Sequence, residues 1–168
     1  MSKYRLTCAV VLTAVLQMSA AAQQAAPLTA ADTARIKKEV ADAVDNYYSL
    51  FTAQNMKALP EQVYNIPWIL MTARGPQPDL TKEQAQARFE ASLKGLLESG
   101  WGKSVFTTTN VCVLNATAAI ASGYNTRYKK DGSVMSVGGV TYVFNKTADG
   151  WRIVTYTGTA KETVVRCE

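Results

Sequence analysis

A run of four predicted strands occupies residues 104–159 and sets the architecture available to this chain. Valine, isoleucine, threonine, tyrosine and phenylalanine dominate the run, as they do on half-buried sheet surfaces. Asp131-Gly132 and Asp149-Gly150 are typical of tight turns, and such short connections make consecutive strands antiparallel neighbours. Gly138-Gly139 inside the third strand predicts a bulge or a sharp bend that helps the sheet curl. The strands of this expected meander are about Ser104–Leu114, Thr117–Lys129, Val134–Lys146 and Trp151–Thr159.

The residues before the meander carry helix signals and one further strand. Thr29 lies three residues ahead of Asp32, a helix-start pattern, and apolar side chains then recur on one helical face. That face contains Ile36, Val40, Val44, Tyr47 and Phe51. Four segments are expected to follow: a short helix at Met56–Leu59, a strand at Ile66–Thr72, a turn at Arg74–Asp79 and a third helix capped by Thr81.

The first 22 residues have the layout of a secretory signal peptide. Lys3 and Arg5 form a short basic start, Leu6–Leu16 is mostly apolar, and Ser19–Ala22 supplies small side chains for cleavage. A membrane-spanning helix needs roughly 20 apolar residues, so we expect no stable membrane insertion after cleavage. The predicted location is periplasmic or secreted. The predicted segments are a signal peptide at 1–22, a flexible leader at 23–32, one domain at 33–160 and a tail at 161–168.

Cleavage after Ala22 leaves two cysteines, Cys112 in a predicted strand and Cys167 in the tail. An even number of cysteines in an exported chain suggests a disulfide, which would fasten the tail across the sheet. The alternative is two free thiols, one of them buried as a small apolar residue. The sequence gives no distance between the two residues, so both arrangements stay open.

Composition argues against several classes of function. The chain contains no histidine, and two separated cysteines form no metal cluster, so no metal site and no cofactor are expected. The glycine-rich motifs that bind phosphates are missing from the sequence. Without Lys3 and Arg5 the chain has 16 basic against 13 acidic residues, and the scattered basic residues predict no nucleic acid binding. The predicted strands also lack carboxylates, because Asp131 and Asp149 both lie in turns.

The order of long helix, short helix, strand, helix and curled meander resembles the nuclear-transport-factor-2-like superfamily, which includes SnoaL-like polyketide cyclases and ketosteroid isomerase. The resemblance covers about residues 33–159 and rests on Tyr47–Phe51, Lys130-Asp131-Gly132 and Asp149–Val154. It implies an α+β fold, in which a cone-shaped, curled antiparallel sheet wraps around an N-terminal long helix and two shorter helices. It also implies a cavity at the open end of the cone and a homodimer formed by the outer sheet faces.

Four side chains are candidate ligand contacts in this cavity: Tyr47, Trp68, Tyr142 and Thr155. The Tyr47 hydroxyl could orient a ligand or bond to the backbone, and Trp68 could line the cavity mouth or pack in the core. Thr155 has the position at which relatives place a pocket residue, and Tyr142 shares a strand face with another aromatic side chain. Arg127 would favour an anionic ligand if it faced inward, but an outward, solvated arginine is the commoner arrangement.

These residues favour a cavity that binds a small apolar ligand and is not recognisably catalytic. Enzymes of the superfamily use carboxylate or histidine groups in the cavity, and the predicted strands offer neither. One alternative is a SnoaL-like isomerase, cyclase or dehydratase acting on a small hydrophobic carbonyl compound, with Tyr47 as hydrogen-bond donor and Asp45 as base. A second is a protein-interaction domain that uses the outer sheet face. On that face we expect an apolar patch of Val143, Val154 and Tyr156.

Overall fold

The computed structural model of the protein describes residues 27–167, and the predicted signal peptide lies outside the described residues. Helix α1 spans Ala30–Thr52 and begins at the cap that the sequence predicts, because the Thr29 hydroxyl accepts a hydrogen bond from the Asp32 N–H at 3.1 Å. The helix therefore starts three residues before the expected domain boundary at residue 33. Neither α1 nor any other helix in residues 27–167 is long and apolar enough to cross a membrane. The buried residues of α1 are Ile36, Val40, Val44, Tyr48 and Phe51.

Two helices and two strands connect α1 to the meander. Helix α2 spans Ala58–Gln62, strand β1 Tyr64–Thr72, strand β2 Gly75–Asp79 and helix α3 Lys82–Glu98. The predicted turn at 74–79 is wrong, because residues 75–79 form a strand paired antiparallel with β1. Pro76 and Pro78 conceal this strand in the sequence. Proline cannot donate to a neighbouring strand, but β2 is the edge strand of the sheet, where proline is tolerated.

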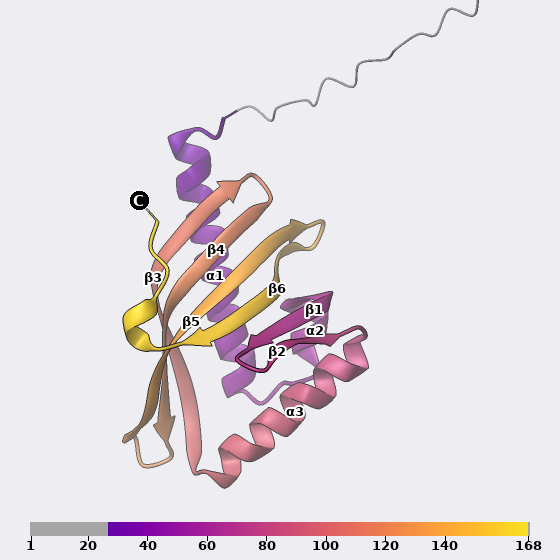
Figure 1. The fold of residues 1–168 in the computed structure, drawn as a ribbon, viewed down its shortest axis with the longest axis vertical. Coiled ribbons are helices and arrows are strands. Elements are labelled where there is room, and N and C mark those ends of the chain that lie inside the picture. The colour runs from indigo at the N-terminus through magenta and orange to yellow at the C-terminus, as the bar shows by residue number, and fades with distance from the viewer. Residues whose placement is uncertain (1–26, 168) are drawn as a thin grey trace, which may run out of the picture.

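The predicted meander forms strands β3 (Trp101–Asn115), β4 (Ala118–Lys129), β5 (Val134–Thr147) and β6 (Gly150–Thr159). These strands join β1 and β2 in one six-stranded sheet with the order β2-β1-β6-β5-β4-β3. All neighbours are antiparallel except β1 and β6, which run parallel. Figure 1 shows α1 behind the long strands and α3 crossing below β1 and β2.

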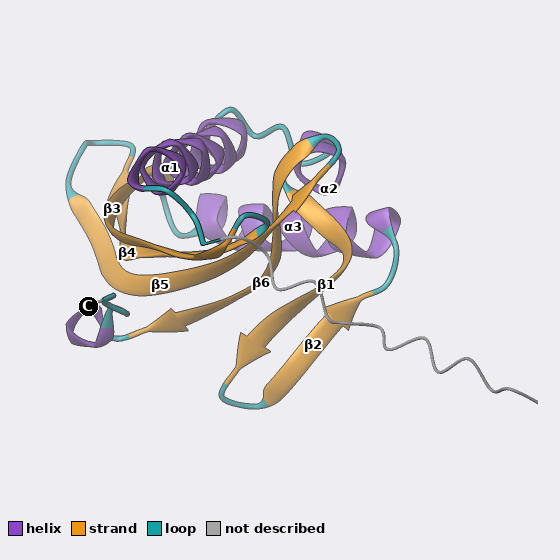
Figure 2. Cartoon of the chain, turned by 90° about the horizontal axis from the view of Figure 1, so that it is seen from above, coloured by secondary structure: helices purple, strands orange, loops and turns teal. Residues whose placement is uncertain are grey.

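The sheet curls around the helices, which lie on its concave side, while the C-terminal segment lies on the opposite side (Figure 2). This arrangement is the α+β cone that the sequence predicts. The core fills the space between the helices and the sheet, and each large apolar side chain buried there contributes about 1.5–3 kcal/mol to folding. The largest fully buried side chains include Trp68, Trp101, Phe144, Ile36, Leu59 and Ile153.

Gly139 permits a close approach between two parts of the chain. The pairing of β5 with β4 is continuous through Gly138 and Gly139, so the predicted bulge does not occur there. A Cβ atom at Gly139 would lie 2.7 Å from the Ala160 carbonyl oxygen, whereas one at Gly138 would meet nothing closer than 3.8 Å. Gly139 is therefore needed because the chain leaving β6 passes directly over it.

After β6 the chain crosses the convex face of the sheet. A short 3-10 turn at Lys161–Thr163 is followed by an extended segment, in which the Val165 N–H donates to the buried Ser122 hydroxyl at 3.0 Å. Cys167 then forms a disulfide with Cys112, with 5.6 Å between the two Cα atoms. The tail reaches β3 by passing over β5 and β4. This route joins the first and last strands of the meander, which are not neighbours in the sheet.

Candidate functional site

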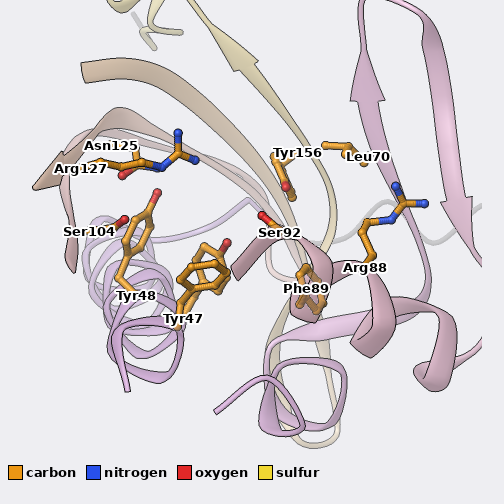
Figure 3. A pocket seen from close by; sticks show the side chains of 11 residues that line it. Tyr47, Tyr48, Leu70, Arg88, Phe89, Ser92, Ser104, Asn125, Arg127 and Tyr156 are labelled. Atoms are coloured by element: carbon orange, nitrogen blue, oxygen red, sulfur yellow. The ribbon is translucent and has the colours of Figure 1, made fainter. Parts of the chain in front are cut away.

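Two adjoining cavities lie inside the curl of the sheet, beside the C-terminal half of α1. The smaller has a volume of about 110 Å³ and is bounded by helices α1 and α3 and by four strands. The larger has a volume of about 330 Å³ and is bounded by α1 and strands β4, β5 and β6. Figure 3 shows the side chains around the smaller cavity, with those of α1 reaching toward β4. Four residues line both cavities: Tyr47, Asn125, Arg127 and Tyr156.

Tyrosines provide much of the aromatic lining. The hydroxyls of Tyr48 and Tyr142 share a hydrogen bond of 2.8 Å, and the Tyr142 ring packs against Tyr47 and Tyr156. Burial raises the pKa of Tyr47, Tyr48 and Tyr156, because a charged phenolate would lose its hydration. These hydroxyls therefore stay protonated at neutral pH. They can serve as neutral hydrogen-bond partners for a ligand.

A β-bulge in β6 decides which side chain of that strand enters the cavity. The pairing with β5 skips one residue between Ile153 and Thr155, which leaves Val154 as an extra residue. The alternation of faces then shifts by one position, so Tyr156 turns inward. Thr155 donates its hydroxyl to the Ile69 carbonyl at 2.7 Å and lines neither cavity. The inward Thr155 and outward Tyr156 expected from the sequence are thus reversed.

The other three candidate residues lie in different surroundings. Trp68 is fully buried, with its ring stacked against Phe89 at 5.5 Å and Tyr156 at 5.4 Å between centroids. The sequence allows Trp68 to line the cavity mouth or to pack in the core. The structure places it in the core, and it lines neither cavity. Tyr142 lines the larger cavity and Tyr47 lines both. The structure brings Tyr47 and Tyr142 together, and ligand contact by either stays a prediction.

Arg127 faces inward, the less common of the two arrangements that the sequence allows. Its Nε atom is buried and has no hydrogen-bond partner, and the ion pairs found within residues 27–167 do not include it. The Asn125 Oδ1 atom is buried without a partner as well. Arg88, which lines the smaller cavity, is neutralised by Asp79 through hydrogen bonds of 2.7 and 2.8 Å. Arg127 is therefore the cation of the lining that lacks a counter-charge.

Among the described residues, the carboxylate that lies next to the lining is that of Asp79, which is bonded to Arg88. Within the described part of the chain, none of the lining residues is an aspartate or a glutamate. Asp45, the expected base of the enzyme alternative, is exposed and lines a separate surface groove beside Ser49 and Lys103. Residues 27–167 also contain no group of three His, Cys, Asp or Glu side chains that could hold a metal ion. The described lining can therefore hold and orient a molecule through aromatic rings, hydroxyls and Arg127.

Sequence reasoning missed several lining residues because they come from different elements. One signal could have found Asn125 and indicated the direction of Arg127: Ala119, Ala121 and Gly123 alternate along β4 as small inward residues, and the same alternation continues to Asn125 and Arg127. A buried strand face that ends in polar residues is typical of a cavity wall. The missed lining residues of the smaller cavity are Tyr48, Phe51, Leu70, Arg88, Phe89, Ser92, Ser104, Asn125 and Tyr156.

Comparisons with known proteins agree on the fold. Residues 38–161 match the model of a family described as NTF2-like protein (DUF6841). The sequence has no match among curated proteins. An NTF-2 like protein of unknown function from Shewanella oneidensis MR-1 is 15% identical with a TM-score of 0.58, and the match covers 73% of this chain and 97% of that one.

Two further solved structures give the same result. A nuclear transport factor 2-like superfamily protein from Salmonella enterica is 19% identical with a TM-score of 0.56, covering 76% of this chain and 92% of that one. A ketosteroid isomerase-like protein from Erwinia carotovora atroseptica is 17% identical with a TM-score of 0.52, covering 73% of this chain and 93% of that one. Identities this low establish a common fold and carry no information about activity.

Proposed function

The chain belongs to the NTF2-like family DUF6841, and on that premise we propose that its two adjoining cavities bind one small organic ligand. The observation that carries the proposal is the lining, where aromatic rings meet polar atoms of Tyr47, Asn125, Arg127 and Tyr156 at the junction of the cavities. Ligand sites typically combine an apolar wall with a few polar groups that fix the orientation of the ligand. The sequence predicts an apolar ligand, and this lining favours one that also carries polar atoms.

The proposed activity is binding rather than acid–base catalysis. General acid–base chemistry needs a titratable group whose pKa lies near the working pH and which reaches the ligand. The described lining contains no carboxylate, and burial moves the pKa of the lining tyrosines further from neutrality. Tyr47 and Asp45, the pair suggested for a SnoaL-like enzyme, are not assembled at one site, because Asp45 lies in the exposed groove.

We also propose that the protein acts after export, in the periplasm or outside the cell. The basic start, apolar run and small residues of positions 1–22 support this. Sequencing the N-terminus of protein taken from the periplasm of its native host tests the proposal. A chain that begins at Gln23 is expected, and an uncleaved chain found only in the cytosol would contradict it.

Native mass spectrometry of protein purified from its own host tests ligand binding. We expect a bound species of low mass, and Ser92→Trp should remove it, because Ser92 lines the smaller cavity and an indole there would fill the space. Ala91→Trp is the matched control, since Ala91 is an exposed neighbour on α3 outside the lining. A wild-type protein without bound mass, together with a crystal structure showing a dry and closed interior, would refute the proposal.

A further inference from the structure

We propose that the ligand is a small organic monocarboxylate and that Arg127 binds its carboxylate group. This inference rests on the proposed function and adds the charge and the functional group of the ligand. It follows from three features of the cavities: unpaired buried atoms, the net charge of the lining and the aromatic walls.

Arg127 is a half-buried cation without a counter-charge. Its Nε atom has no hydrogen-bond partner, and the ion pairs of residues 27–167 leave out its guanidinium. The Asn125 Oδ1 atom, two positions earlier on the same face of β4, is also buried and unpaired, but it is an acceptor and needs an N–H or O–H donor, which a carboxylate does not supply. Buried polar groups in proteins almost always have a partner, because an unpaired one is costly. An anionic oxygen of a ligand would supply the partner that Arg127 lacks.

The charge of the lining fits a monoanion. Arg127 contributes one positive charge, Arg88 is balanced by Asp79, and the lining tyrosines are neutral. A dianion such as phosphate would leave one negative charge uncompensated in a partly buried site, which is unfavourable. A carboxylate matches the single charge, and its two oxygens can accept parallel N–H bonds from one guanidinium.

The surroundings of the guanidinium favour a flat ligand. Arg127 lines both cavities together with Tyr47 and Tyr156, whose hydroxyls can complete the hydrogen bonds of a carboxylate. Figure 3 shows Tyr47 and Tyr48 on one side of the cavity and Phe89 and Tyr156 on the other. Aromatic walls pack best against a flat apolar body.

Isothermal titration of the mature protein, residues 23–168, with two probes of equal shape tests the inference. Benzoate carries the carboxylate, and benzamide replaces it by a neutral amide. At low salt we expect benzoate to bind at least about tenfold more tightly than benzamide, because charge-assisted hydrogen bonds to guanidinium are stronger than neutral ones. Arg127→Gln should abolish this preference. Arg74→Gln, which removes an exposed arginine from the β1–β2 turn, should keep it.

Three other results of these titrations would refute the role of Arg127 or the carboxylate class of the ligand. Equal binding of benzoate and benzamide, or a preference that survives in R127Q, refutes the role of Arg127 and leaves the proposed function standing. Inorganic phosphate binding as tightly as benzoate refutes the carboxylate class. Failure of every probe to bind refutes the inference alone, because the proposed function is decided by native mass spectrometry of protein from its own host. If R127Q does not fold, as judged by circular dichroism, the comparison of the two probes on the wild-type protein still decides the ligand class.

Discussion

The hydroxyls of Tyr48 and Tyr142 join α1 to β5 through one hydrogen bond of 2.8 Å. The two side chains are only 7% and 2% exposed, so each hydroxyl depends on the other for a partner. We expect Tyr48→Phe or Tyr142→Phe to lower the free energy of unfolding by about 1–2 kcal/mol, because each change leaves a buried hydroxyl unpaired. Urea denaturation measures the effect.

The double variant Y48F/Y142F is the control for this bond. It removes both partners together, so its loss of stability should be smaller than the sum of the two single losses. Strictly additive losses would show that the two hydroxyls do not depend on each other.

Glu39 connects α1 to the sheet. Its Oε2 atom accepts hydrogen bonds of 2.8 Å from Lys146 and from the Trp151 indole, and Oε1 accepts one of 2.9 Å from Arg35. Hydrogen bonds from Lys146, Trp151 and Arg35 lower the pKa of Glu39 from 4.5 to about 2. A carboxyl whose pKa is lowered by folding stabilises the protein above its unfolded pKa, and this stabilisation is lost as the pH falls through the folded value.

Glu39→Gln should therefore lower the free energy of unfolding at pH 7 by about 1 kcal/mol, a modest value because solvent screens this half-exposed cluster. The difference from the wild type should shrink between pH 4.5 and about 2. Urea titrations at a series of pH values measure it. Glu90→Gln removes an exposed carboxylate bonded only to Gln86 and should have little effect at any pH. A constant difference for E39Q across this range would contradict the prediction.

The site residues show where sequence reasoning succeeds and where it stops. Tyr47 could be placed on an inward face because the periodicity of α1 decides it, whereas the face of Tyr142 depends on the strand register, which the sequence does not fix. Arginine is usually exposed, so the residue type at position 127 argues for the outer face, and only its alternation with Ala121 and Gly123 indicates the inner one. Trp68 has a core position because Phe89 and Tyr156, from two other elements, stack on it. Such contacts between distant segments leave no periodic signal.

At the scale of elements, the bulge in β6 is the feature that the sequence conceals. Alternation predicts Thr155 inward from Ile153, and the extra residue Val154 reverses the faces beyond it. A bulge depends on how two strands pair, so it cannot be read from one strand alone. The exchange of Thr155 for Tyr156 in the cavity is the direct result. One bulge therefore changes the lining from a small hydroxyl to an aromatic ring.

The end of β6 passes close to Gly139 of β5, whereas the neighbouring Gly138 has open space around it and serves as the control. Gly139→Ala would place a methyl group 2.7 Å from the Ala160 carbonyl oxygen and 2.5 Å from Thr159 Oγ1, whereas Gly138→Ala would meet nothing nearer than 3.8 Å. We expect G139A to lower the free energy of unfolding by about 1–3 kcal/mol through overpacking, and G138A to change it little. Equal effects in chemical denaturation would show that the close approach is not what requires Gly139.

The C-terminal tail is held to the sheet chiefly by the Cys112–Cys167 disulfide and by the hydrogen bond from Val165 to Ser122. The bridge spans a sequence separation of 55 residues, and a loop of that length gives roughly 4 kcal/mol in the chain-entropy account. Cys167→Ser should lower the melting temperature of the mature protein and leave its circular dichroism unchanged, because the tail contributes nothing to the buried core. Arg166→Ser, an exposed neighbour, is the control.

The state of the two cysteines is measured by thiol titration of the unfolded, unreduced mature protein. An exported protein meets an oxidising compartment, so we expect no free thiol. Two free thiols per chain would mean that the bridge does not form in the cell. In that case C167S should leave the melting temperature unchanged.

At the scale of the whole molecule, most of the fold could be predicted from the sequence. Helical periodicity and capping residues identify α1 and α3, and the Asp-Gly turns identify the β3–β6 meander to within about three residues at each end. The parallel pairing of β1 with β6 could not be predicted, because it joins segments about 85 residues apart with no local signal. Strand β2 was hidden by its prolines, which are acceptable only because the strand lies at the sheet edge.

We propose that two chains associate through the convex face of the sheet. The inward turn of Tyr156 removes one residue of the apolar patch expected there, and the tail crosses the same face, where the Val165 N–H bonds to the buried Ser122. Farther along the sheet, β1 still presents Ile69 and Met71 outward at 40% and 52% exposure. A paired apolar surface is more stable than one left in water, so we propose a homodimer that covers these two residues.

Light scattering on the mature protein at tens of micromolar should give twice the mass of a single chain. Met71→Glu should shift the protein toward the monomer, because each chain would then bury an unpaired charge in the interface. Leu80→Glu changes a residue that is 64% exposed just ahead of α3, away from the sheet face, and should leave the mass unchanged. A wild-type protein that scatters as a strict monomer contradicts dimerisation, and a dimer that tolerates M71E places the interface elsewhere.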